Sequence, residues 1–250
     1  MRKGGSPSFL DAPSCVAGEP GRYDAAFALP VSSMSHFRRK ASAATCESPV
    51  AWTFFRQWLK NPLSMAAFSP SGKQLAKAMV SQLPVGARRV IELGGGTGVF
   101  TRALLEHGIA PADLMVVELN EALHRLLQHR FPGVQVIRGD ARELADLATR
   151  THFLDQGPAD AVVSGLGLLS MSRSMQRDIL RSAFSVLAPH GRLIQFTYGP
   201  ASPVSRELLA ELGLSARRGS VAWINVPPAT VYTYTRNRST AVPARAPASR

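Results

Sequence analysis

The stretch VIELGGGTGVFTRALL, from Val90 to Leu105, decides how this chain folds. A short β-rich run ends in a cluster of glycines, and the glycines open into a segment with Phe100 and Leu104 on one helical face. A strand, a tight loop and a helix N-terminus in this order begin a nucleotide-binding βαβ unit. A dinucleotide fingerprint that started at Gly94 would place its third glycine at Val99, so that register fails.

The loop instead follows the pattern E-x-G-x-G-x-G, formed by Glu92, Gly94, Gly96 and Gly98. This pattern resembles the signature of class I S-adenosylmethionine-dependent methyltransferases, and the resemblance implies that these four residues bind S-adenosylmethionine. Glycine suits backbone that approaches a ligand closely or adopts positive φ, and the helix N-terminus behind it favours a carboxylate. The alternative is a glycine-rich turn without a ligand, which the spacing of the following elements disfavours.

The strand expected over 114–119 places an acidic residue where a ribose would bind. Glu118 lies at its carboxyl end, 20 residues after Gly98. In this kind of fold an acidic residue at that point accepts hydrogen bonds from ribose hydroxyls. The plainer interpretation is a surface carboxylate at a strand end.

Two further strand ends supply the remaining expected cofactor contacts. The strand expected over 134–139 leads into Asp140 and Ala141. Asp140 resembles the residue that holds the adenine amino group in these enzymes, although it is also suited to cap the next helix. Ser164, within the strand expected over 160–170, completes the set.

The order of elements predicts the fold class. Strands alternate with helices from Arg88 to about Leu212, and two β-rich runs follow between 213 and 236. This order predicts an α/β, Rossmann-like methyltransferase fold with a mostly parallel seven-stranded sheet, helices on both faces and a terminal antiparallel strand pair.

Composition bounds the class of partner. The chain has 250 residues, of which 45% are hydrophobic, and a formal net charge of +12. A balance this basic indicates an anionic partner, either nucleic acid or an acidic membrane surface. The two cysteines, Cys15 and Cys46, suggest neither a disulfide scaffold nor a metal site and suit a reducing compartment. No apolar run reaches the about 18 residues of a spanning helix, and no signal peptide is evident.

The pattern divides the chain into four parts. Residues 1–48 are rich in Gly, Ser, Pro and Ala without a period and are expected to be disordered. Residues 49–69 are expected to form an amphipathic helix, 70–237 the methyltransferase domain and 238–250 a loose tail.

The segment AWTFFRQWLK, from Ala51 to Lys60, combines aromatic rings with cations at helical spacing. Interfacial membrane helices use this combination, because rings settle at headgroup level and cations meet lipid phosphates. The alternative is a helix that buries its rings in the domain core. The expected membrane-binding residues are Trp52, Phe55, Arg56, Trp58, Leu59 and Lys60.

Replacing Trp52 and Trp58 by alanine is expected to weaken binding to anionic liposomes, because the interfacial rings are lost. Co-sedimentation with such vesicles measures this, and unchanged binding would contradict the membrane interpretation.

The glycine loop also resembles that of ribosomal RNA adenine dimethyltransferases, and the charge would suit RNA. Those enzymes carry an Asn/Asp-(Leu/Ile)-Pro-(Tyr/Phe) signature after the fourth strand, which stacks on the base. Here residues 164–167 read Ser-Gly-Leu-Gly, without an aromatic ring or a proline. An RNA substrate is therefore disfavoured.

A second resemblance, from Phe55 to Arg236, is to bacterial phospholipid N-methyltransferases, which methylate phosphatidylethanolamine. One departure is the sequence Gly165-Leu166-Gly167, where that family would have a proline-bearing turn. The matching pieces include NPLSMAAFSPSGKQLAKAM, VIELGGGTGVFTRALLEHGI, QFTYGP and VPPATVYTYTR.

This resemblance implies methylation of phosphatidylethanolamine, and of its mono- and dimethyl derivatives, towards phosphatidylcholine. Tyr198 is the candidate catalytic residue, to orient the amine, with ring packing as the alternative. Arg217, Arg218 and Arg236 are candidates for the lipid phosphate, with solvated cations as the alternative. The expected site is the cytoplasmic face of the inner membrane, with anionic lipids as further partners, and no metal, nucleic acid or obligate protein partner is expected.

Three alternatives remain at this point. The acceptor is another aminolipid, such as an ornithine lipid; or the enzyme is an RNA methyltransferase; or the chain is a membrane-binding protein that keeps cofactor binding without catalysis. The identity of the methylated acceptor separates these cases.

Overall fold

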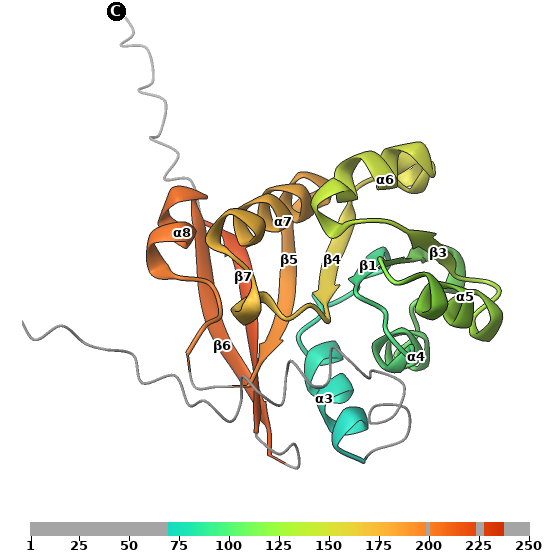
Figure 1. Cartoon of the computed structure of the whole chain (residues 1–250), viewed down its shortest axis with the longest axis horizontal. Coiled ribbons are helices and arrows are strands. Elements are labelled where there is room, and N and C mark those ends of the chain that lie inside the picture. Colours follow the sequence, from blue (N-terminus) through green and yellow to red (C-terminus); the bar gives the residue numbers. More distant parts are fainter. Residues whose placement is uncertain (1–69, 199–200, 224–227, 238–250) are drawn as a thin grey trace, which may run out of the picture. The chain divides into compact units, whose positions relative to one another are not determined.

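The computed structural model of the protein describes residues 70–198, 201–223 and 228–237 (Figure 1). The expected disordered segment 1–48, the expected aromatic helix 49–69 with its membrane-binding residues, and the expected tail 238–250 lie outside the described residues. Those expectations stay predictions. Among the described helices, none is both long and apolar enough to cross a membrane.

Seven strands form one sheet in the order β3-β2-β1-β4-β5-β7-β6. The first five strands pair in parallel, whereas β7 pairs antiparallel with both β5 and β6. This confirms the predicted Rossmann-like fold and its terminal antiparallel pair. The strands are β1 (Val90–Leu93), β2 (Leu114–Glu118), β3 (Gln135–Arg138), β4 (Ala159–Ser164), β5 (Leu187–Thr197), β6 (Leu214–Ala222) and β7 (Ala229–Arg236).

Helices cover both faces of the sheet, each over its own apolar core (Figure 1). The side chains of α6, α7 and α8 pack into one core, and those of α3, α4 and α5 into the other. The α-helices are α3 (Pro70–Val80), α4 (Val99–Glu106), α5 (Glu121–Arg130), α6 (Leu144–Arg150), α7 (Arg173–Val186) and α8 (Arg206–Glu211). Short 3-10 turns are η1 (Pro111–Asp113), η2 (Ala141–Glu143), η3 (Phe153–Gln156) and η4 (Leu168–Ser170).

The fourth strand is shorter than its sequence predicts. The expected strand 160–170 ends at Ser164, and η4 follows. Here the Gly165 N–H donates to the Leu93 carbonyl at 2.8 Å, while Gln195 Nε2 donates to the Leu166 carbonyl at 2.7 Å. These long-range bonds turn the chain towards β1, which local apolarity could not indicate.

Arg236 has a structural role that its sequence position does not reveal. Its guanidinium donates to the carbonyls of Ala188, at 2.7 Å, and Leu187, at 3.2 Å, and to that of Phe184, and it also lies over the Phe184 ring. The expectation of a lipid phosphate contact or a solvated cation is therefore wrong for Arg236. A cation that satisfies carbonyls at a helix C-terminus stabilises that end.

Replacing Arg236 by alanine is expected to lower the free energy of unfolding by about 2 kcal/mol, because three carbonyls lose a charged donor. Urea denaturation measures the change. Arg217→Ala is the matched control, since Arg217 is an exposed arginine on the neighbouring strand. Equal stability of the two variants would contradict the role given to Arg236.

Candidate functional site

The glycine loop between β1 and α4 requires glycine for conformational reasons. Gly94, Gly96 and Gly98 have φ values of 72°, 54° and 84°. Side chains strongly disfavour this left-handed region. Gly98 is the N-cap of α4 and carries no side-chain cap, and the Gly94 N–H donates to the Val117 carbonyl at 2.8 Å. The loop thus joins β1, β2 and α4 in one rigid turn.

The glycines also differ in what faces them. A Cβ on Gly98 would lie 2.4 Å from Phe131 Cε2, so this glycine lets α5 pack closely against the loop. A Cβ on Gly96 would meet only the Gly94 carbonyl oxygen, at 4.0 Å. The loop is therefore packed on the Gly98 side and open at Gly96, where a ligand can approach the backbone.

Glu118 lies at the carboxyl end of β2 and fixes the glycine loop. Its Oε2 accepts a hydrogen bond from the Gly96 N–H, and its Oε1 accepts one from the Asn120 N–H, both at 2.9 Å. Only 8% of the residue is exposed. Since each carboxylate oxygen can accept two hydrogen bonds, both oxygens keep capacity for ribose hydroxyls.

Glu92 is fully buried in β1. Its Oε2 accepts a 2.6 Å hydrogen bond from the Thr101 hydroxyl in α4, whereas its Oε1 has no hydrogen-bond partner among the described residues. Burial raises the pKa of Glu92 to about 8, the hydrogen bond from Thr101 opposes this, and the charge of Glu118 adds to it. A cationic ligand bound beside Glu92 would favour its ionised form and lower this pKa again.

The raised pKa of Glu92 predicts that the cofactor-free protein loses stability as pH rises. The unfolded chain releases this proton near pH 4.5 but the folded chain keeps it to about pH 8, so stability falls between these values and is level above them. Between these pH values the free energy of unfolding falls on the order of 3–5 kcal/mol further in the wild type than in Glu92→Gln, whose side chain stays neutral. Urea denaturation across pH 4–9 measures it, and parallel curves for the two proteins would contradict it.

Asp140 and Ala141 follow β3 at the same edge of the sheet. Asp140 caps η2, because its Oδ1 accepts from the Arg142 N–H at 2.9 Å, and its Oδ2 pairs with the Arg142 guanidinium at 2.7 Å. The hydrogen bond from Arg142 holds the pKa of Asp140 below its usual value. Asp140 thus has the capping role named as its alternative, and the adenine contact stays a prediction. Ala141 is half-buried at the start of η2.

Ser164 and Gln195 face each other across β4 and β5. The buried Ser164 hydroxyl accepts from the Leu166 N–H at 3.3 Å. Gln195 is fully buried, its Nε2 donates to the Leu166 and Phe196 carbonyls at 2.7 Å, and its Oε1 finds no hydrogen-bond partner among the described residues. The sequence analysis missed Gln195, although a glutamine within the apolar run LIQFT was a signal.

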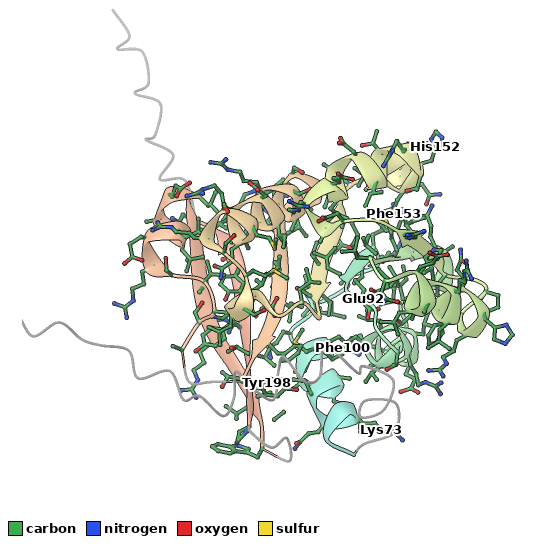
Figure 2. The ribbon with its side chains drawn as sticks, viewed as in Figure 1. Lys73, Glu92, Phe100, His152, Phe153 and Tyr198 are labelled. Atoms are coloured by element: carbon green, nitrogen blue, oxygen red, sulfur yellow. The ribbon has the colours of Figure 1, made fainter. Side chains whose placement is uncertain are left out.

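Three aromatic rings form a wall beside the loop. Phe100, in the first turn of α4, meets Phe196 of β5 edge to face, with centroids 5.9 Å apart. Phe196 in turn meets Tyr198 at 5.5 Å. Figure 2 shows Phe100 and Tyr198 on one side of Glu92. Tyr198 therefore packs as its alternative interpretation expected, and its contact with the substrate amine stays a prediction.

These residues fit S-adenosylmethionine. The open backbone at Gly96 and the free acceptor capacity of Glu118 and Glu92 match a ligand with hydroxyl and cationic groups. Leu119, which directly follows Glu118, is a large apolar side chain that is 66% exposed. The sequence analysis did not single out Leu119.

Comparisons with known proteins agree with this geometry. The family model described as a methyltransferase domain matches residues 90–191. The ornithine lipid N-methyltransferase of Singulisphaera acidiphila is 34% identical over 151 residues, which are 59% of this chain and 77% of that protein. Ribosomal RNA small subunit methyltransferase A of Synechococcus sp. is 36% identical over 92 residues, which are 35% of this chain and 29% of that protein.

A solved structure shares the fold. Magnesium protoporphyrin IX methyltransferase of Synechocystis, with bound S-adenosylmethionine, superimposes with a TM-score of 0.53 at 14% identity. The match covers 75% of this chain and 93% of that chain. The match to the methyltransferase domain and the identity and coverage of the ornithine lipid enzyme show the family: the chain belongs to the class I S-adenosylmethionine-dependent methyltransferases.

Proposed function

We propose that this methyltransferase transfers methyl groups to the amine of an aminolipid. The observation that carries the proposal is the relative named ornithine lipid N-methyltransferase, whose 34% identity extends over 77% of its length. Ornithine lipid and phosphatidylethanolamine are the two candidate acceptors, the first from this relative and the second from the sequence resemblance. The cofactor supplies an activated methyl group, and the aromatic residues beside the glycine loop are our candidates to hold the amine.

The aromatic wall supports an amine acceptor. A primary ammonium has a pKa near 10, so it must lose a proton before its nitrogen lone pair can attack. Phe100, Phe196 and Tyr198 form a series of edge-to-face rings that begins in the first turn of α4, directly after the glycine loop. Partial desolvation against these rings lowers the pKa of the amine and favours the neutral, nucleophilic form.

The atoms balance in a single displacement. The lipid ammonium first releases its proton to water. Its neutral nitrogen then bonds to the methyl carbon, the bond from that carbon to sulfur breaks, and a neutral thioether leaves while the positive charge passes from sulfur to nitrogen. The rate depends on holding nitrogen and methyl carbon in line at roughly 3 to 3.5 Å. Tyr198 is our candidate to orient the amine through its hydroxyl.

The loop after β4 favours a lipid amine over a nucleobase. A Cβ on Gly165 would lie 2.8 Å from the Gly94 carbonyl oxygen, and a Cβ on Gly94 would lie 2.8 Å from Leu166 Cδ2. This loop is closely packed on the glycine loop and offers no ring that could stack on a flipped base.

The test is transfer of labelled methyl from S-adenosylmethionine to lipid. Vesicles contain either phosphatidylethanolamine or ornithine lipid, and chromatography resolves the products and counts the methyl groups. Tyr198→Phe is the matched variant, because it keeps the ring contact with Phe196 and removes only the hydroxyl. Label in either lipid supports the proposal. Absence of label in both, with the cofactor bound, overturns it.

A further inference from the structure

Exposed large apolar side chains gather at one edge of the described domain. Five such side chains are present among the described residues: Val85, Leu119, Leu169, Met175 and Trp223. Four of them lie at the carboxyl edge of the parallel strands, which is also the edge that carries the glycine loop. The exception is Val85, in the loop that enters the amino-terminal end of β1.

The topology establishes this placement. Because β4 ends at Ser164 and α7 returns from the carboxyl edge, Leu169 in η4 and Met175 in the first turn of α7 lie there. Strand β6 is antiparallel to β7, which is antiparallel to β5, so β6 runs in the same direction as β5. Trp223 directly follows Ala222, the last residue of β6, and so lies at this edge too.

These residues stand apart from the cofactor contacts. Leu119 directly follows Glu118, our candidate acceptor for the ribose, whereas Leu169, Met175 and Trp223 belong to elements on the other side of β1. Their exposed fractions are 48%, 37% and 72%. Exposed apolar residues grouped around a site indicate an interaction surface. We call Leu169, Met175 and Trp223 the apolar rim.

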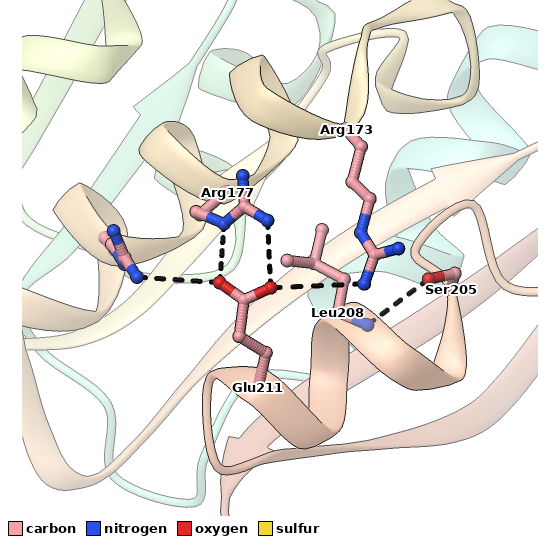
Figure 3. A network of polar contacts seen from close by, with 6 residues as sticks. Arg173, Arg177, Ser205, Leu208 and Glu211 are labelled. Carbon is pink, nitrogen blue, oxygen red and sulfur yellow. Dashed lines mark hydrogen bonds and ion pairs between the residues drawn. The ribbon is translucent and has the colours of Figure 1, made fainter.

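Cations accompany the apolar rim. Arg173, Arg177 and Arg181 of α7 lie 4.0, 2.6 and 3.6 Å from the carboxylate of Glu211 (Figure 3), and the charges of Glu207 and Asp178 also act on Arg173 and Arg177. Arg173 begins α7 at the carboxyl edge, and its side chain is 54% exposed. Arg173 is therefore an exposed cation two residues before Met175, and its ion pair with Glu211 is the longest of the three.

We propose that the carboxyl edge is a membrane-docking face, in which the apolar rim enters the interface of a bilayer and Arg173 meets anionic headgroups. This inference rests on the proposed aminolipid substrate and names how the site reaches it. Tryptophan suits the boundary between headgroups and acyl chains, Arg173 lies two residues before Met175, and the net charge of +12 favours an anionic surface. Docking by this edge presents the cofactor site directly to lipid amines.

Tryptophan fluorescence in the full-length chain tests the insertion. The chain has three tryptophans, so the Trp52→Phe/Trp58→Phe variant leaves Trp223 as its only one. The probe is a vesicle of phosphatidylcholine and anionic phosphatidylglycerol, with bromine on the upper acyl carbons and no aminolipid. We expect quenching of Trp223 by brominated vesicles and none by unbrominated ones. Vesicle-bound protein whose Trp223 is not quenched overturns the proposal.

Vesicle binding by variants tests how much the apolar rim contributes to membrane affinity. Leu169→Ser/Met175→Ser/Trp223→Ser is expected to bind the same vesicles about tenfold or more weakly, because three apolar side chains are lost. Val85→Ser is the matched control and is expected to bind like the wild type, since it removes an exposed apolar side chain at the opposite edge. Calorimetric cofactor binding shows that each variant is folded. Equal partitioning of the triple variant, once folded, and the wild type overturns the proposal.

The two proposals fail in different ways. Trp223 quenched by vesicles, without methylation of any aminolipid, overturns the proposed function and supports the docking face. Methylation of an aminolipid with Trp223 unquenched, and with the triple variant as active as the wild type on vesicles, overturns the docking face and supports the function. A protein partner at this edge would give the second pattern.

Discussion

Gly98→Ala is expected to destabilise the fold by about 3 kcal/mol or more. The substitution combines two costs at one position. Backbone at φ 84° costs an L-residue about 1–2 kcal/mol, and the new Cβ would lie 2.4 Å from Phe131 Cε2 and 3.1 Å from Leu127 Cδ2. Overpacking of this kind adds about 1–3 kcal/mol, because α5 must shift. Urea denaturation measures the loss.

Gly86→Ala separates the two costs. Gly86 has a similar φ of 72°, but a Cβ there would meet nothing within 4 Å. Its variant should lose only the conformational part, about 1 kcal/mol. The double variant Gly98→Ala/Phe131→Leu should lose less free energy of unfolding than the two single variants lose together, because the Phe131 ring is the main obstacle to the new Cβ. Equal losses for Gly86→Ala and Gly98→Ala would contradict the steric argument.

The sequence was most informative where local pattern and topology agree. The glycine register from Glu92 to Gly98 predicted a strand, loop and helix, and the alternation of elements predicted a mostly parallel seven-stranded sheet with a terminal antiparallel pair. These features depend on hydrophobic period and on glycine at positive φ, both of which are local properties.

Long-range contacts limited the prediction of the site. Gln195 binds a carbonyl 29 residues away, and Arg236 binds carbonyls 48 or more residues away. Nothing in the sequence around either residue indicates its partner, so Gln195 was missed and Arg236 was misassigned. Asp140 shows the converse, since its bond to the Arg142 N–H is the local cap that its position favoured.

The apolar rim was missed for the same reason. Leu169, Met175 and Trp223 come from three elements up to 54 residues apart, and each alone is an ordinary exposed apolar residue. Only the parallel direction of β4 and β6 brings them to one edge. The aromatic segment 51–60 could be proposed from the sequence because its rings are close together in the chain, and its membrane role stays a prediction.

Glu118→Ala is expected to weaken S-adenosylmethionine binding about 100-fold or more. The carboxylate holds the Gly96 N–H and the Asn120 N–H at 2.9 Å, and it is our candidate acceptor for the ribose. Its removal costs the ribose contact and releases the glycine loop at the point where the backbone is open. Hydrogen bonds to charged groups contribute about 1.5–3 kcal/mol each, and two of them account for this change. Isothermal titration calorimetry measures the dissociation constant.

Two variants decide whether the effect is specific to Glu118. Glu118→Gln keeps one acceptor oxygen but turns an N–H₂ group towards the other backbone donor. Its dissociation constant for S-adenosylmethionine should therefore lie between those of the wild type and Glu118→Ala. Asp140→Ala should weaken binding less than Glu118→Ala, because Asp140 Oδ2 already accepts two hydrogen bonds from the Arg142 guanidinium and because Glu118, unlike Asp140, also holds the Gly96 N–H of the glycine loop. Affinity of Glu118→Ala within threefold of wild type would contradict the ribose assignment. A larger loss of cofactor affinity in Asp140→Ala than in Glu118→Ala would make Asp140, the candidate adenine contact, the main anchor of the cofactor.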